Sequence, residues 1–470
     1  MSGFLGSLVQ VPLNSVTIPD NRKNNVSCLP ETPPPMQPPD ANQPPQGDAL
    51  SRRELIRQMF AAKLLATSSA LAIPMGLRNT ALGEPALPAA KKKVAAIVTV
   101  YRKMSHADVL VGKILEGWHQ DGGPGPELEL VSLFVDQFPP EDMAVGLAKK
   151  HGFKLCESIE QAMTLGQGAI AVDGVLSIGE HGEYPWNDLG QHLYPRKRFF
   201  QEITDAMIRY GRVVPVFNDK HPGPSWDDAA WMAERAKELK LPWMAGSSLV
   251  VSTRNPDGNL GWQQPVRAAL GIGYSGLDIY GIHTLEFLQC ILERRRGGEI
   301  GVTHVQALPT TAIQGLLDNG TIHAELLDAA LVATGTERRA VLDNPPADGA
   351  AFILEYADGL VVPVLMLPGL AQGIGAAVLP ESGPLFATRV EEREKPYYPH
   401  FAYLLKGIER MIHTGKPSYP VERTILTSGI LDRLLRSLHE KNRKISTPEL
   451  RIAYQPTDYP YAPNIQLETL

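Results

Sequence analysis

Cysteine is scarce in this sequence, and charge of one sign is not in excess. The three cysteines, Cys28, Cys156 and Cys290, have none of the short CxxC spacings of zinc or redox sites. We expect Cys156 and Cys290 to be small buried apolar residues, with pairing between them as the alternative. The formal net charge of −6 creates no field that would attract nucleic acid or an anionic membrane. Nucleic acid is therefore disfavoured as a partner.

The chain also lacks the compositional bias of a disordered or fibrous protein. Its apolar share of 43% and charged share of 20% are ordinary for a soluble globular protein. A length of 470 residues exceeds what one hydrophobic core usually serves. We therefore predict three parts: a leader over residues 1–90, a first domain over 91–255 and a second domain over 256–470.

The leader has two features that a folded domain would lack. Residues 29–46 are dense in proline, which removes backbone donors and apolar bulk, so this stretch cannot build a core. Arg52 and Arg53 then precede an apolar run over 59–75 that Lys63 and serines interrupt, which makes it too short and polar for a stable membrane span. The pattern resembles a twin-arginine export signal, and a short amphipathic helix is the alternative. It predicts an exported, periplasmic or extracytoplasmic protein.

From Val94 onward, apolar runs alternate with helical stretches. This alternation predicts a parallel sheet covered by helices, in a doubly wound α/β domain. Strands are expected at 94–100, 128–136, 170–179 and 212–220, and helices at 105–115, 141–151 and 226–239. Ser225 and Asp228 have the spacing of a capping box, which predicts where the last of these helices begins.

The second domain has a different pattern. A helix with apolar residues at core spacing follows Tyr280 and is expected to stop at Gly297. Residues 352–367 form two alternating runs around Asp358 and Gly359, which predicts a β-hairpin. Two long helices are expected over 399–416 and 421–442. We predict an α+β domain with a largely antiparallel sheet, whose exposed face would suit a homo-oligomer.

The order of these segments, from about Val94 to Pro456, resembles the glucose-fructose oxidoreductase, inositol dehydrogenase and MocA-like family. The resemblance implies a Rossmann-type domain that binds NAD or NADP, and an oxidoreductase acting on a sugar or polyol hydroxyl with a tightly held cofactor. Lys220 matches the lysine of the family's Glu-Lys-Pro segment, with Asp219 in place of the glutamate and His221 in place of the proline. By this match Lys220 would contact both the substrate and the nicotinamide ribose.

A second match lies on the helix after Tyr280. His283 resembles the histidine of the family's Asp-x-x-x-His segment, which acts as a general base on the substrate hydroxyl; Asp278 stands one residue too early for that spacing. An imidazole titrates near neutrality and can accept a hydroxyl proton, so Lys220 and His283 are the predicted catalytic residues. A buried core histidine and a surface lysine are the alternatives.

The family's G-x-G-x-x-G loop is missing. Residues 100–106 read VYRKMSH, and side chains forced into left-handed geometry would cost about 1–2 kcal/mol per residue. The loop must therefore follow another path, with basic side chains that either pair with phosphates or lie on the surface. If a cofactor binds, its predicted contacts are Tyr101, Arg102, Ser105, Asp136 and Lys220.

A histidine-rich stretch follows the strand at 170–179. In a doubly wound sheet, ligands collect at the carboxyl ends of the strands, so this stretch should face the cleft. The predicted substrate-binding residues are His181, Tyr184, His192, Asp219, His221 and Tyr280. Glu180, His181, His192 and His221 are the alternative ligands of a divalent metal, although they lack standard metal-site spacing.

Two hypotheses about function stay open at this point. The first is the NAD(P)-dependent oxidoreductase acting on a small carbohydrate, which Lys220 and His283 favour. The second is a protein that has lost nicotinamide binding and uses the cleft for metal-assisted lyase or hydrolase work on carbohydrate, or only to bind it. The missing glycines favour the second.

Overall fold

The computed structural model describes residues 91–468. The proline-rich stretch and the predicted export signal lie outside these residues. Within them, no helix is long and apolar enough to cross a bilayer.

The first sheet has six strands in the order β3-β2-β1-β4-β5-β6, and all of their pairings are parallel. Its strands are β1 (Lys92–Val98), β2 (Leu128–Val135), β3 (Lys154–Cys156), β4 (Gly174–Ile178), β5 (Val216–Asp219) and β6 (Trp243–Gly246). This is the predicted doubly wound arrangement. Strands β3 and β6 were not predicted.

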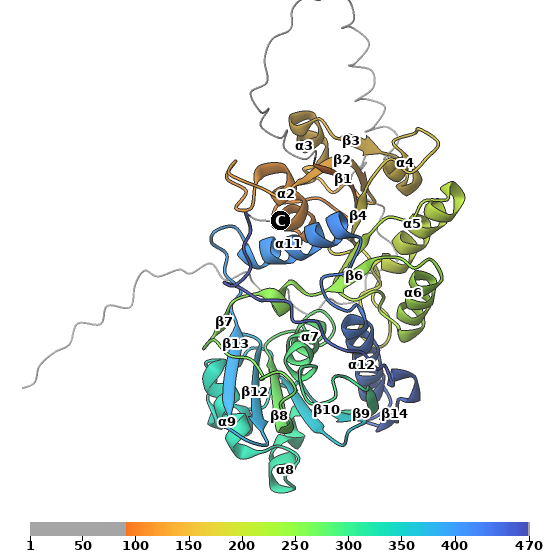
Figure 1. Ribbon diagram of the computed structural model, residues 1–470. Helices are drawn as coiled ribbons and strands as arrows, with labels where there is room; N and C mark the ends of the chain where they lie inside the picture. The colour runs from red at the N-terminus through yellow and green to blue at the C-terminus, as the bar shows by residue number, and fades with distance from the viewer. Residues whose placement is uncertain (1–90, 469–470) are drawn as a thin grey trace, which may run out of the picture. The chain divides into compact units, whose positions relative to one another are not determined.

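Helices cover both faces of this sheet (Figure 1). They are α2 (His106–Glu116), α3 (Ala144–His151), α4 (Ile159–Thr164), α5 (Arg196–Tyr210) and α6 (Trp226–Glu238). Alternate residues of β1 enter different cores, since Val94 and Ala96 pack in one cluster and Ala95 and Ile97 in another. Ser225 accepts the N–H of Asp228 and caps α6, as predicted.

The second sheet has eight strands in the order β14-β9-β10-β11-β8-β12-β13-β7. Only the β8–β11 pair is parallel, so the predicted largely antiparallel sheet is confirmed. Its strands are β7 (Arg254–Asn255), β8 (Val266–Gly273), β9 (Val302–Leu308), β10 (Ala350–Tyr356), β11 (Val361–Met366), β12 (Gly375–Pro380), β13 (Phe386–Val390) and β14 (Ile445–Ser446). The hairpin predicted around Gly359 joins β10 to β11, and Gly359 has the positive φ of 89° that its turn requires.

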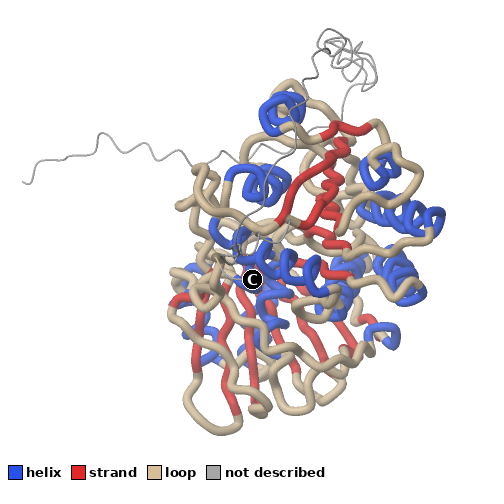
Figure 2. The backbone as a smooth tube through the Cα atoms, turned by 45° about the horizontal axis from the view of Figure 1, so that its top comes forward, coloured by secondary structure: helices blue, strands red, loops and turns tan. Residues whose placement is uncertain are grey.

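The remaining helices, apart from α11, lie on the two faces of the second sheet. They are α7 (Gly281–Leu292), α8 (Ile313–Asp318), α9 (Ala324–Ala333), α10 (Arg338–Asp343), α11 (Pro399–Thr414) and α12 (Glu422–His439), with short 3-10 turns η1 (Ser248–Val251), η2 (Thr310–Ala312) and η3 (Pro448–Leu450). Helices α7 and α12 pack on one face and α9 on the other. Figure 2 shows the strands of the two sheets with helices beside them. Helix α11 instead contacts α2 and η1, so a late segment of the chain returns to the first sheet.

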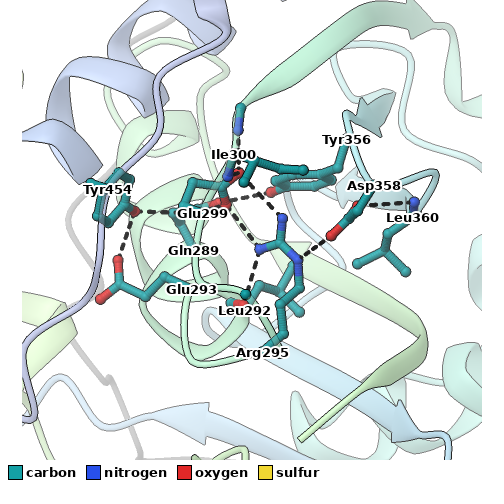
Figure 3. Close-up of polar contacts among 12 residues, drawn as sticks. Gln289, Leu292, Glu293, Arg295, Glu299, Ile300, Tyr356, Asp358, Leu360 and Tyr454 are labelled. Carbon is teal, nitrogen blue, oxygen red and sulfur yellow. Dashed lines mark hydrogen bonds and ion pairs between the residues drawn. The ribbon is translucent and has the colours of Figure 1, made fainter. Parts of the chain in front are cut away.

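A network of polar side chains, buried except for Asp358, lies beside the end of α7 (Figure 3). We call it the α7 network; its members are Gln289, Glu293, Arg295, Glu299, Tyr356, Asp358, Arg423 and Tyr454. Arg295 donates to Glu299 over 2.9 Å and to Asp358 over 2.7 Å. Tyr454 joins Glu293 to Gln289, because its hydroxyl donates to Glu293 and accepts the side-chain N–H of Gln289, which also donates to Glu299. This network ties α7 to the chain's last segment.

Candidate functional site

A cavity of about 250 Å³ lies at the carboxyl ends of β4 and β5, where α7 and α11 also reach the first sheet. Its polar lining comprises Glu180, Lys220, Ser248, Tyr280, Glu392, Tyr398 and four histidines, His106, His181, His283 and His400. Ligands of doubly wound folds bind at this end of the strands. The cavity is therefore the candidate site.

Lys220 is held in an unusual backbone conformation. It follows β5 directly, its φ is 59°, and its N–H bonds to the carbonyl of Gly246. A non-glycine residue in this left-handed region costs about 1–2 kcal/mol, and such strain persists where the surroundings enforce it. The ammonium of Lys220 is buried and bonds to Glu180 over 2.7 Å.

Glu180 is bound by a second cation. Its other oxygen receives Arg196 over 2.5 Å, and Arg196 also donates to Nε2 of His221 over 3.1 Å. Burial alone would raise the pKa of Glu180, but Lys220 and Arg196 hold it well below its usual range. Burial lowers the pKa of His221 to about 3, so its ring is neutral and its Nδ1–H donates to Gly223. Glu180 thus positions Lys220 and has no open oxygen for a metal.

His283 is held from the end of β6. Its Nδ1 lies 2.6 Å from the hydroxyl of Ser247, and Glu286, one turn further along α7, accepts the N–H of Ser247. Burial lowers the pKa of His283 well below its usual range, with Lys220 adding to the effect, so the ring is neutral. Burial also raises the pKa of Glu286 to about 7. A Cβ at Gly246 would lie 2.6 Å from Glu286, so only glycine lets α7 approach β6 this closely.

The other three histidines complete the cavity wall. His106 bonds through Nδ1 to Asp219 over 2.6 Å, and its ring lies 5.3 Å from that of His181. Burial lowers the pKa of His181 and of His400 to about 3 each, so both are neutral. Within residues 91–468, Nε2 of His181 and Nδ1 of His400 have no hydrogen-bond partner. Buried polar atoms without partners are rare, and here they adjoin a cavity where a ligand can satisfy them.

The β1–α2 loop tests whether a dinucleotide fits. Such a cofactor needs free N–H groups at the start of α2 for its pyrophosphate. Here the carboxylate of Asp108 accepts the N–H of Met104 over 2.8 Å and the hydroxyl of Tyr397 over 2.7 Å. Ser105 takes the N–H of Asp108, and Tyr101, at the centre of the loop, is fully buried. A negative charge of the chain itself thus stands where the phosphates would bind.

The acidic residue just after β2 is also bound by other side chains of the chain. Asp136, the predicted ribose ligand, accepts the hydroxyl of Tyr184 over 2.8 Å and pairs with Arg198 over 2.7 Å. Arg102 pairs with Glu141 over 3.2 Å at the surface. The residues present therefore do not fit a dinucleotide in this arrangement, and we derive no step through one.

The cavity contains some of the residues that the sequence singled out and leaves others outside. Lys220, His283, His181 and Tyr280 line it together. Outside the cavity lining lie Tyr184, His192, Asp219 and His221. Asp219 bonds to His106 of the cavity, and His221 bonds to Arg196, which in turn binds Glu180.

Sequence reasoning did not single out His106 or His400. His106 begins α2 and His400 lies in the first turn of α11, and neither carries a local signal of function. Only the return of α11 to α2 brings them to one cavity.

The alternative metal ligands do not come together. His192 bonds to the carbonyl of Tyr184, while Glu180 and His221 share Arg196. In the part of the chain that the structure describes, no group of three or more His, Cys, Asp or Glu residues has the arrangement of a metal site. Cys156 and Cys290 are both buried, in different apolar clusters.

The chain matches no protein-family model and no curated protein. Solved structures of similar fold include apo scyllo-inositol dehydrogenase from Lactobacillus casei, with 12% identity, a TM-score of 0.48, and coverage of 76% of this chain and 98% of that one. A myo-inositol dehydrogenase from Corynebacterium glutamicum has 12% identity, a TM-score of 0.46 and the same coverage. An aldose-aldose oxidoreductase from Caulobacter crescentus has 14% identity, a TM-score of 0.43, and coverage of 76% and 99%. Likeness at this level says nothing of what this chain binds.

Proposed function

We propose that this chain is an enzyme that transfers protons on a small sugar with a carbonyl group, as an isomerase or lyase does. One observation carries the proposal: a neutral histidine and a buried lysine, His283 and Lys220, line the same cavity, and each is held by a buried partner. Groups fixed in this way are arranged for general acid–base chemistry.

The geometry assigns each residue a role. In the tautomer whose Nδ1–H donates to Ser247, His283 keeps a lone pair on Nε2 that can accept a proton from the carbon beside the substrate carbonyl. The ammonium of Lys220 stabilises the negative charge that then develops on a substrate oxygen, in a site where burial strengthens that attraction. The proton returns from His283 to another substrate atom, or to a leaving hydroxyl that departs as water. No electrons leave the substrate, so no oxidant is required.

The substrate class follows from the cavity's size and lining. A volume of about 250 Å³ suits one small ring rather than a dinucleotide together with a substrate. His181 and His400, each with an unpartnered nitrogen within the described residues, line the same cavity as Lys220 and Tyr280, which favours a ligand with several hydroxyls. A metal-assisted variant is not proposed, because both oxygens of Glu180 are bound by cations.

An NAD(P)-dependent oxidoreductase acting on a sugar or polyol is the second candidate. The strand order β3-β2-β1-β4-β5-β6, with Asp136 just after β2 and Lys220 just after β5, favours it. For this function the contact between Asp108 and Tyr397 must open to admit the pyrophosphate. In that function too, His283 would accept the proton of the substrate hydroxyl.

Two experiments test the proposal. The full chain is purified and denatured, and the released small molecules and metals are identified by mass spectrometry; stoichiometric NAD(H) or NADP(H) would favour the second candidate. The protein is then incubated with single aldoses and ketoses in D₂O, and proton NMR follows exchange at the carbon beside the carbonyl. We expect exchange with the wild type and its loss in His283→Asn and Lys220→Met. Exchange that survives both substitutions would overturn the proposal.

We also propose, from the sequence, that the protein is exported and that it self-associates. Mass spectrometry of the mature chain from its native host would show whether residues before the folded part are removed. Light scattering of the purified protein would give the oligomeric state.

A further inference from the structure

A groove of about 500 Å³ lies next to the cavity. Ile279 and Tyr280 line both, so the groove and the cavity share a wall. The groove also contains Trp186, whose side chain is 52% exposed, and the leucines Leu435 and Leu438 of α12. A large aromatic ring exposed to solvent beside a candidate active site indicates a surface where a ligand or partner can bind.

Trp186 is held flat by a stack of rings beneath it. Its ring lies 4.3 Å from that of His192 with an angle of 18° between the planes, and His192 in turn lies 4.0 Å from Tyr194. A bridge between Trp186 and His192 fixes the backbone on both sides of this turn. The side chain of Gln191 anchors the turn by donating to Asp432 of α12 over 3.1 Å. One face of Trp186 is therefore stacked, and the exposed remainder is presented in a fixed orientation.

Two acceptors beside the platform lack donors. Asp278 lines the groove and is 6% exposed; one of its oxygens receives the N–H of His192, and the other has no partner within the described residues. His192 bonds to the carbonyl of Tyr184 through Nε2, which must carry the proton, so Nδ1 is an acceptor, and it is also without a partner. Unpaired buried acceptors favour a ligand that brings hydroxyl donors. The exposed carboxylate of Asp188 adds a third acceptor at the rim.

We propose that this groove binds a second sugar ring, so that the substrate is a glycoside or short oligosaccharide with one ring in the cavity and the next on Trp186. The inference rests on the proposed function, because it extends the substrate out of the same cavity. A pyranose ring has an apolar C–H face that packs on an aromatic plane and a rim of hydroxyls that donate to Asp278 and Asp188. An alkyl chain would leave the second carboxylate oxygen of Asp278 without a hydrogen bond. The ordered stack under Trp186 lowers the entropy lost on binding.

Isothermal titration of the full chain with matched single-ring and two-ring probes tests this inference. The probes are methyl glucoside, methyl galactoside, cellobiose, maltose and lactose. We expect at least one disaccharide to bind about tenfold or more tightly than its matching single ring, and Trp186→Ala to abolish the difference. Asp278→Asn should reduce it. Trp262→Ala is the matched control, because Trp262 is 45% exposed and lies outside the groove.

The outcomes separate this inference from the function on which it rests. His283→Asn should lose proton exchange yet keep the preference for two rings, since His283 lies in the cavity and not in the groove. A two-ring preference that survives Trp186→Ala would overturn the inference alone. So would a change of oligomeric state in Trp186→Ala, which would show that a second copy covers the groove. Failure of every probe to bind the wild type would count against both.

Discussion

Two clusters of polar side chains adjoin α7, one at each end, and they differ in how completely their polar atoms are hydrogen-bonded. At its end, the α7 network is saturated: within the described residues, no side-chain nitrogen or oxygen of Arg295, Glu299 or Tyr454 lacks a partner (Figure 3). At its start, the cavity cluster is open, with partnerless nitrogens on His181 and His400.

Backbone strain divides in the same way. Lys220 and His181, both in the cavity wall, have positive φ, whereas no member of the α7 network does. A saturated polar network stabilises a fold, while an open and strained one is stabilised by its surroundings and is available to a ligand. We therefore infer that the polar side chains at the end of α7 stabilise the fold and that those at its start bind the ligand.

The largest effect expected from this comparison is on turnover. His283→Asn removes the proposed base, so the rate of proton exchange should fall about 10²- to 10⁴-fold. The free energy of unfolding should change by no more than about 1 kcal/mol, because Ser247 keeps the N–H of Leu249 as a partner. NMR exchange rates and urea unfolding measure the two quantities. A variant that unfolds easily and loses little activity would reverse the assignment of the cavity end.

The second effect is on stability alone. Arg295→Met leaves the carboxylate of Glu299 buried with one cation fewer, and we expect a loss of about 3–5 kcal/mol in the free energy of unfolding. Arg339→Met is the matched control, because its ion pair with Asp343 is exposed and should contribute less than about 1 kcal/mol. Urea unfolding compares both with the wild type. Equal effects would mean that the network does not stabilise the fold more than a surface pair does.

The third effect depends on pH and concerns Glu286, which lies between the two ends. Burial raises its pKa in the folded protein from the ordinary value of 4.5 to about 7. A raised folded pKa means that the stability from the neutral form is present below about 4.5 and is lost as the pH rises through about 7. Relative to Glu286→Gln, the wild type should thus lose up to about 3 kcal/mol between pH 4.5 and 8. Urea unfolding at intermediate pH values follows this loss, and parallel curves for the two proteins would show that Glu286 is ionised throughout.

Local signals explain why so much of the fold could be predicted from the sequence. The apolar runs of β1 and β2, the serine that caps α6 and the turn at Gly359 each depend on residues that are close along the chain. The two catalytic candidates, Lys220 and His283, were identified through the resemblance of their segments. The proportion of antiparallel pairing in the second sheet followed from its hairpin.

The rest of the site depends on contacts between distant residues. Asp108 meets Tyr397 across 289 positions of sequence, so nothing in the β1–α2 segment indicates that a hydroxyl will bond to that carboxylate. His400 reaches the cavity only because α11 packs on α2. Tyr184 and His192 follow a strand end, yet the stack under Trp186 and the bond to Asp136 direct them away from the cavity. Tertiary packing, and not residue type, decides which histidines are open.

The smallest expected effect is a gain in stability, because the substitution removes a polar atom that has no hydrogen-bond partner within the described residues. His400 is buried, and its Nδ1 has no partner within residues 91–468, so His400→Phe deletes a desolvated polar atom while keeping the ring contact with Phe401. We expect the free energy of unfolding to rise by about 1 kcal/mol and sugar binding to weaken. His413→Phe is the control on the same helix, and it should destabilise by a similar amount because Nε2 of His413 bonds to the carbonyl of Glu127 over 3.1 Å. Urea unfolding and calorimetric titration measure both variants. If His400→Phe destabilised the protein without weakening sugar binding, His400 would stabilise the fold, as the α7 network does. An unpartnered buried polar atom is expected only where it serves to bind a ligand.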